Sequence, residues 1–240
     1  MTEEMLLLAR GLLTALHKNP ERYDLPKIEA AYALAYHAHE GQKRQSGDPY
    51  ISHPLAVAES VAGLGLDTDT VCAALLHDTV EDCENITLDT LRREFGEEVA
   101  RLVDGVTKLQ NLHLSGDHGK GTKDKNVDRL EMQAENLRKM FLAMAKDVRV
   151  IVIKLADRLH NMRSLNFLSY ERQQRMASET LDIYAPLAGR LGISQIKCEL
   201  EDLCLKYLDP EFYEMLVYGI REKLSERKEF EQTSSAKPAW

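Results

Sequence analysis

Apolar side chains recur at helical spacing along most of this chain. Segments with this period cover residues 3–17, 27–40, 54–63, 68–82, 87–96, 97–110, 128–145, 171–190, 195–207 and 210–227. Helix-boundary residues support several of them, including Pro54 and Gly63 at the two ends of one segment and Thr87 as an N-cap. We found no segment with the strict alternation of a half-buried strand, so the pattern predicts an all-α fold.

The run from residue 148 to 153 is the one stretch whose composition suits a strand, because it is rich in β-branched residues. The apolar positions nevertheless keep a period of about 3.6 residues as far as Met162. These positions are Val148, Ile151, Val152, Leu155 and Leu159. The longer pattern therefore predicts a buried helix.

Two segments lack this periodicity. Residues 114–127 are polar and glycine-rich, and we expect a mobile surface loop there. Their glycines and lysines do not form a phosphate-binding P-loop motif after a strand, so a P-loop is not favoured. Residues 229–240 have no apolar face, and we expect a flexible tail.

Composition limits the classes of protein that this chain can represent. With 240 residues, 44% of them hydrophobic and 29% charged, it can bury a substantial core. The net charge of -8 argues against general nucleic-acid binding, which needs clustered positive charge. The sequence has no apolar run long enough to span a membrane and no signal-peptide pattern. The four cysteines form no CxxC pair, so we expect free thiols in the cytoplasm.

The strongest chemical signal is the segment from His77 to Asp82. If this segment is helical, His77, Asp78, Glu81 and Asp82 fall on one arc. Leucines at 75 and 76 and Val80 surround the arc, so it is not an ordinary solvated stripe. Negative charge gathered at the end of a buried helix is costly unless a cation neutralises it. The pattern therefore indicates a metal site.

Further ligands must come from distant segments. His53 directly precedes the predicted helix at 54, and Asp157 lies on a polar stripe of the 148–162 helix. Two imidazoles and two carboxylates suit Mn²⁺, Fe²⁺ or Zn²⁺, and the lack of cysteine argues against a closed structural zinc site. Each residue also has a simpler interpretation, such as a loop histidine, an ion pair of Asp157 with Arg158, or a polar helix end. The set taken together favours a metal-dependent enzyme.

The sequence resembles the hydrolase domain of RelA/SpoT-type alarmone enzymes, within the HD superfamily of metal-dependent phosphohydrolases. The resemblance is carried by four segments, residues 41–54, 73–82, 106–109 and 154–162. The resemblance extends from about residue 29 to about residue 208. It implies an HD-domain helical bundle that uses Mn²⁺. It also implies hydrolysis of the 3′-pyrophosphate of guanosine tetra- and pentaphosphate, (p)ppGpp, to GDP or GTP plus pyrophosphate, which ends the stringent response.

The resemblance also implies a role for individual residues. It makes His53, His77, Asp78 and Asp157 the Mn²⁺ ligands, and Glu81 and Asp82 the acid/base pair. It places Arg44, Gln45, Ser46, Asn161 and Ser164 around the nucleoside. Gln45 stands where the family often has Lys, and Ser164 replaces a frequent Thr while keeping the hydroxyl group.

The resemblance divides the chain into a hydrolase domain at 1–184, a connector-like helical segment at 185–228 and the tail. Long family members continue into a synthetase domain, whose motifs are missing here, so we expect no synthetase activity. The sequence leaves open whether this is a fragment of a longer parent chain or a stand-alone hydrolase. Two other functions remain: a different HD-type nucleotide phosphohydrolase, and a non-catalytic HD module that binds nucleotide for regulation. The 42–50 segment argues against the first, and the intact ligand set and Glu81–Asp82 pair argue against the second.

Overall fold

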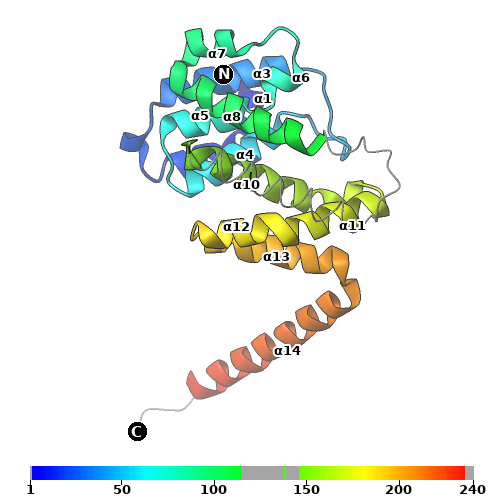
Figure 1. The fold of residues 1–240 in the computed structure, drawn as a ribbon. Helices are drawn as coiled ribbons and strands as arrows, with labels where there is room; N and C mark the ends of the chain where they lie inside the picture. The colour runs from blue at the N-terminus through cyan, green and yellow to red at the C-terminus, as the bar shows by residue number, and fades with distance from the viewer. Residues whose placement is uncertain (1, 115–137, 139–145, 236–240) are drawn as a thin grey trace, which may run out of the picture. The chain divides into compact units, whose positions relative to one another are not determined.

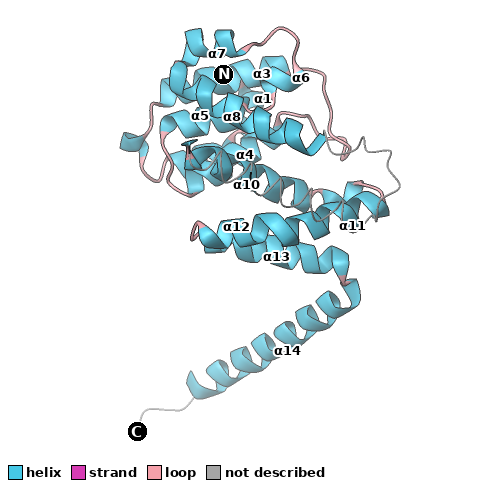
Figure 2. Ribbon diagram, in the orientation of Figure 1, coloured by secondary structure: helices cyan, strands magenta, loops and turns pink. Residues whose placement is uncertain are grey.

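The structure is a computed structural model that describes residues 2–114, 138 and 146–235. Within these residues all regular elements are helices, and the only β-type pairing is an isolated bridge between Lys43 and Pro49 (Figure 2). The predicted all-α fold is therefore confirmed. The chain forms two compact units, Met1–Phe167 and Leu168–Trp240. The predicted boundary after residue 184 stays a prediction.

The first unit contains the metal-site segments (Figure 1). Its helices are α1 (Glu3–Leu8), α2 (Arg10–Leu16), η1 (Pro20–Arg22), α3 (Leu25–Ala38), α4 (Ser52–Gly63), α5 (Thr68–Leu76), α6 (Thr79–Asp82), α7 (Leu88–Phe95), α8 (Glu97–Leu114), α10 (Val148–Arg163) and η3 (Leu165–Phe167). The apolar segment Val71–Leu76 makes α5 hydrophobic on every side, and each residue in it is buried. Helix α5 accordingly packs against α3, α4, α8 and α10 at the centre of the unit.

Helix α10 is the second buried element that positions the site. Residues 150–159 are all buried, including the polar Lys154, Asp157 and Arg158. Asp147 caps its first turn, accepting a hydrogen bond from the Arg149 backbone N–H at 3.0 Å. The helix predicted from the apolar period is thus confirmed, and the β-branched run at its start does not form a strand. Burial on both sides explains why such residues are tolerated here.

Two predicted helices are interrupted in the structure. The segment 3–17 forms α1 and α2, which are separated at Ala9. The segment 68–82 forms α5 and α6, with a break at His77 and Asp78, so the single helical arc expected for this motif is wrong. By contrast, the predicted Thr87 cap is confirmed: its hydroxyl accepts from the Thr90 backbone N–H at 3.2 Å.

The second unit is also helical. It contains α11 (Tyr170–Glu179), the π-helical turn η4 (Thr180–Tyr184), α12 (Ala185–Arg190), α13 (Ser194–Leu208) and α14 (Pro210–Ser235). The segment predicted as one helix at 171–190 thus contains a π turn just before Pro186, which lacks the N–H that a regular helix uses. Helix α14 extends past the predicted end at Arg227.

Some predictions fall on residues that the structure does not describe. The predicted loop at 114–127 lies outside the described residues except for Leu114, and the predicted helix at 128–145 lies outside them except for Arg138. Among the described helices, none is both long enough and apolar enough to cross a membrane.

Candidate metal centre and active site

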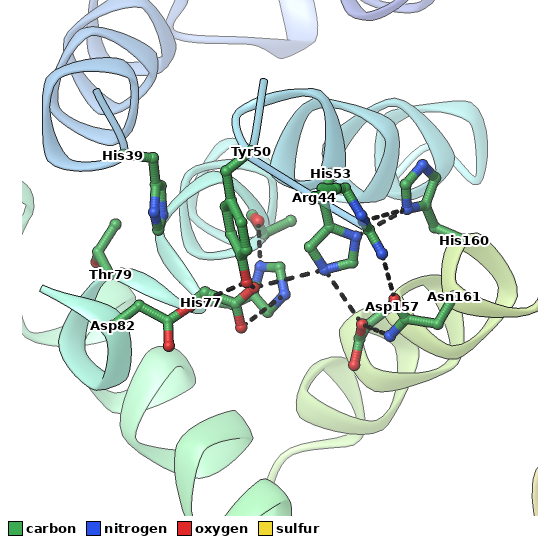
Figure 3. A network of polar contacts seen from close by, with 12 residues as sticks. His39, Arg44, Tyr50, His53, His77, Thr79, Asp82, Asp157, His160 and Asn161 are labelled. Atoms are coloured by element: carbon green, nitrogen blue, oxygen red, sulfur yellow. Dashed lines mark hydrogen bonds and ion pairs between the residues drawn. The ribbon is translucent and has the colours of Figure 1, made fainter. Parts of the chain in front are cut away.

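The four predicted metal ligands come together in the first unit. Figure 3 labels three of them, His53, His77 and Asp157. His53 lies in the first turn of α4, His77 and Asp78 lie at the break between α5 and α6, and Asp157 lies on α10. His53 Nε2 is 3.3 Å from Asp157 Oδ1 and 3.5 Å from Asp78 Oδ2, and His77 Nε2 is 3.2 Å from Asp78 Oδ1. All four residues are at most 4% exposed. The structure thus brings together side chains that are separated by up to a hundred positions in the sequence.

The helix break allows two consecutive residues to face the same point. The Thr79 hydroxyl donates to the Leu76 carbonyl at 2.7 Å, and His77 Nδ1 lies 2.8 Å from the Ala74 carbonyl. These side chains satisfy carbonyl groups at the end of α5 that would otherwise lack partners. Because α5 ends here, His77 and Asp78 both point toward His53 instead of diverging by 100° around a helix.

Hydrogen bonding determines which nitrogen of His77 faces the centre as an acceptor. A carbonyl oxygen only accepts, so Nδ1 of His77 must carry a proton and donate to Ala74. In the neutral ring, Nε2 then has a free lone pair, and this buried atom has no hydrogen-bond partner. A lone pair buried in this way fits a metal ligand.

Both buried carboxylates are ionised. Burial raises the pKa of Asp157, but the positive charge of Lys154 outweighs this effect and holds its pKa well below 3.8. Lys154 Nζ and Asn161 Nδ2 each donate to the carboxylate of Asp157 at 2.6 Å. Burial likewise opposes ionisation of Asp78, and the neighbouring histidines lower its pKa.

The site therefore combines two carboxylates with two imidazoles, and among the described residues Lys154 is the one cationic side chain in contact with the set. Buried acceptors that face one another are unfavourable without a cation between them. Ligand atoms of His53, His77 and Asp157 lie within 4.8 Å of one another, which is close enough to share one ion. The donor set fits a divalent metal of the Mn²⁺, Fe²⁺ or Zn²⁺ class.

The predicted acid/base pair lies at the edge of this centre. Glu81 and Asp82 are in α6, where Glu81 is half-buried and Asp82 is exposed. Burial raises the pKa of Glu81, and the charges of Asp78 and Asp82 raise it further. Both residues line an open cleft of about 730 Å³ that extends to Thr87 and Arg92. The pair thus lies between the buried ligands and a space that can admit a ligand.

Three of the five predicted nucleoside contacts also come together. Arg44 donates to Asn161 Oδ1 at 2.9 Å and lies 3.5 Å from Ser164 Oγ. Gln45 is exposed, and Ser46 donates to Asp48 at 2.8 Å within its own loop, so these two do not join the group. The bridge from Lys43 to Pro49 closes this loop.

Sequence reasoning missed two residues of the site. The Tyr50 hydroxyl lies 2.8 Å from Asp78 Oδ2 and 2.9 Å from Asp82 Oδ2, which links the buried ligands to the exposed pair. His160 Nδ1 lies 2.8 Å from His53 Nδ1 and 2.9 Å from Arg44 Nη1. Burial and the neighbouring cationic groups lower the pKa of His160 to about 3. His160 follows Asp157 by three positions, so helical spacing was the signal available for it.

The comparisons identify the class of protein to which this fold and this site belong. The profile of the family described as "HD domain" matches residues 31–194, which is more than half of the chain. The chain therefore belongs to the HD domain family.

Curated relatives narrow this class further. A GTP pyrophosphokinase of Streptomyces coelicolor is 52% identical over 210 residues, covering 88% of this chain and 23% of that protein. A guanosine-3′,5′-bis(diphosphate) 3′-pyrophosphohydrolase of Vibrio cholerae is 51% identical over 210 residues, covering 86% and 28%. The bifunctional (p)ppGpp synthase/hydrolase SpoT of Escherichia coli K12 is 47% identical over 208 residues, covering 87% and 28%. The chain thus spans about a quarter of the length of these relatives.

A solved structure is similar in fold as well. It is described as a metazoan ortholog of SpoT that hydrolyzes ppGpp and plays a role in starvation responses. The match has a TM-score of 0.50 and 25% identity, and it covers 74% of this chain and 93% of the other. These relatives confirm the resemblance to RelA/SpoT-type enzymes that the motifs indicated.

Proposed function

We propose that this chain hydrolyses the 3′-pyrophosphate of (p)ppGpp with a bound divalent cation, most suitably Mn²⁺. The observation that carries the proposal is the buried set of two unprotonated imidazole nitrogens and two ionised carboxylates with too little positive charge of its own. Relatives with about 50% identity are named either for this hydrolysis or as a GTP pyrophosphokinase. We assign the hydrolase activity because all four proposed metal ligands lie within the residues that match the HD domain.

His53, His77, Asp78 and Asp157 are the residues that would hold the cation. When bound, a divalent ion lowers the pKa of a coordinated water and offsets phosphate charge. Such charge compensation matters here because the chain carries a net charge of -8, which repels a polyphosphate. The lone pairs that His53 and His77 offer, and the ionised states of the two carboxylates, are what this role requires.

Glu81 and Asp82 would handle the protons of the reaction. Water attacks the phosphorus bound to the ribose 3′-oxygen, the bond from that phosphorus to the 3′-oxygen breaks, and pyrophosphate leaves with GDP or GTP as the other product. One proton passes from the attacking water to the protein, and one reaches the 3′-oxygen. A carboxyl group with a raised pKa, such as Glu81, suits this exchange, and the cleft beside it gives access to substrate.

Arg44 would contact the nucleoside together with Asn161 and Ser164. Its planar guanidinium can stack on a purine base or pair with phosphate, which an ammonium group does less well. The hydrogen bonds from Arg44 to Asn161 and His160 hold it beside the proposed metal centre. We also place Gln45 and Ser46 at the edge of this nucleoside site, because they belong to the same loop, and we place the activity in the cytoplasm, where four free cysteines remain reduced.

The test is incubation of the purified chain with ppGpp, with and without Mn²⁺, and separation of the products by ion-exchange chromatography. Equal amounts of GDP and pyrophosphate, formed only with the metal, are the expected result. Asp78→Asn is the matched inactive control. Faster hydrolysis of GTP or of a cyclic nucleotide than of ppGpp would favour a different HD phosphohydrolase. Binding of ppGpp without turnover at any Mn²⁺ concentration would favour a regulatory module.

A further inference from the structure

A chain of hydrogen bonds connects the proposed nucleoside site to the proposed metal centre (Figure 3). Arg44 Nη1 lies 2.9 Å from His160 Nδ1, and the same nitrogen lies 2.8 Å from His53 Nδ1. The rings of His53 and His160 lie with centroids 4.9 Å apart and are tilted by 43°. The His160 ring hydrogen-bonds Arg44 and His53 but none of the other three proposed ligands, so its role differs from theirs.

Arg44 begins this series of hydrogen bonds, and its guanidinium determines which atom is the donor in each bond. A guanidinium has only donors, so His160 Nδ1 must accept and cannot carry a proton. His53 Nδ1 faces the same unprotonated nitrogen and must therefore be the donor. In the neutral His53 ring the proton is then on Nδ1, and Nε2, which faces Asp78 and Asp157, has a free lone pair.

We propose that His160 is a positioning residue that fixes the Nδ1–H tautomer of His53. This tautomer keeps Nε2 available to the metal, so the proposal rests on the metal centre of the proposed function. Without an acceptor at this position, the proton of His53 moves to Nε2, where two carboxylate oxygens within 3.5 Å accept it. A cation would then have to displace that proton before it could bind. Neutral hydrogen-bond partners of metal-bound histidines act in this way in other proteins.

The test measures Mn²⁺ binding without nucleotide in three forms of the chain: wild type, His160→Leu and His160→Asn. Leucine removes the acceptor, whereas the Oδ1 of asparagine restores one near the position of Nδ1. We expect His160→Leu to weaken Mn²⁺ binding by about 10- to 100-fold, in the range found for such partners. We expect His160→Asn to stay within about threefold of wild type. Electron paramagnetic resonance of free Mn²⁺ gives the dissociation constants.

The tautomer itself is measured by long-range ¹H–¹⁵N correlation spectra of the metal-free chain, with His53 assigned by His53→Gln. The wild type and His160→Asn should show the proton of His53 on Nδ1, and His160→Leu should show it on Nε2. This second measurement separates positioning from a merely structural role, which would lower the melting temperature without moving the proton. If His160→Leu does not fold, the spectrum of the wild type alone still shows whether the proton of His53 is on Nδ1.

Three outcomes would overturn the proposal: an Nε2–H tautomer in the wild type, wild-type Mn²⁺ affinity in folded His160→Leu, or no rescue by asparagine. Tyr23→Phe provides a matched control, because it removes a hydrogen bond to the Ala62 carbonyl away from the metal centre. Its Mn²⁺ affinity should stay within about threefold of wild type. Because no nucleotide is present in these experiments, their failure is distinct from a failure of ppGpp hydrolysis.

Discussion

Two clusters of carboxylates in the first unit differ in how their charge is balanced. At the start of α10, Arg149 contacts Asp147 at 2.7 Å, Asp67 at 3.1 Å and Glu98, and Arg101 contacts both Asp147 and Glu98. The chain thus provides the cations for these acids itself. The pKa values of the three carboxyl groups are lowered. Hydrogen bonds from Arg149 are the main cause for Asp147 and Glu98. For Asp67, burial raises the pKa, and hydrogen bonds from Thr70 and then from Arg149 lower it.

The cluster around His53 has a different balance. Asp157 is paired with Lys154, but the contacts of Asp78 are with two histidines and the Tyr50 hydroxyl. The cluster is also more deeply buried than the one at Arg149, so its missing charge costs more. A carboxylate cluster therefore indicates a bound cation when it is deeply buried and the chain provides too few cationic side chains to balance its negative charge. Four experiments test this difference between the two clusters.

Asp78→Asn should have the largest effect. It removes one charge of the buried set, so ppGpp hydrolysis should fall by roughly a thousandfold and Mn²⁺ should no longer stabilise the chain. In the wild type, Mn²⁺ at a hundred times its dissociation constant adds about 2.7 kcal/mol to the free energy of unfolding. Thermal melting with and without Mn²⁺ checks this, and a variant that Mn²⁺ stabilises as much as the wild type would contradict the comparison.

Glu81→Gln should separate binding from chemistry. Glu81 lies outside the ligand set, so Mn²⁺ affinity should stay within about threefold of the wild type. Loss of a proton-transferring group should lower the turnover rate by about 100- to 1,000-fold. Single-turnover measurements at saturating Mn²⁺ give the rate. If Mn²⁺ affinity fell by the same factor as the turnover rate, Glu81 would belong to the buried set of metal ligands.

Tyr50→Phe should have a smaller effect on the same reaction. The hydroxyl group contacts both Asp78 and Asp82, and losing a hydrogen bond to a charged group costs about 1.5–3 kcal/mol. We expect about a tenfold loss of turnover with metal still bound. Tyr23→Phe is the matched control, because it removes a hydrogen bond to the Ala62 carbonyl away from the site. Equal effects of the two variants on turnover would exclude a specific role for Tyr50.

Arg149→Met should change stability rather than activity. The lowered pKa values of Asp67, Asp147 and Glu98 stabilise the fold above their unfolded values of 3.8 and 4.5, and this contribution is lost as pH falls through the folded values. The variant should lose about 1–2 kcal/mol at pH 7, with Asp147 contributing most because it is the least exposed of the three.

Below about pH 4.5 the difference between variant and wild type should shrink. Urea unfolding from pH 7 to pH 3 measures this trend. The exposed Arg93→Met is the control and should show a flat difference from the wild type. A constant deficit for Arg149→Met across this range would mean that Arg149 contributes through packing alone.

Much of the fold was predictable from local signals. The Thr87 cap and the apolar period of α10 placed elements that the structure confirms. The break at His77 was not predicted, because side-chain bonds to the Ala74 and Leu76 carbonyls end α5 while the apolar period continues. The π turn before Pro186 likewise depends on backbone geometry that an apolar pattern does not report.

The structure brings most of the predicted site residues together, whereas sequence reasoning missed Tyr50 and His160, which contact them. His53, His77, Asp78 and Asp157 are prominent because charged and metal-binding side chains among apolar neighbours demand an explanation. Tyr50 and His160 are ordinary residues in the sequence, and their importance comes only from the atoms that they meet in three dimensions. Gln45 and Ser46 show the opposite case. Both are close to Arg44 in the sequence, yet Gln45 is exposed and the Ser46 hydroxyl donates to Asp48 within its own loop.

The break between α5 and α6 has a thermodynamic consequence. Its carbonyl groups are bonded by the side chains of His77 and Thr79, so the turn needs no ion to hold its shape. An incoming cation would meet a preorganised cradle and would spend little of its binding energy on ordering the backbone. Far-UV circular dichroism should therefore show almost no change in helix content when the cation binds, unlike in zinc fingers, which fold only with the metal.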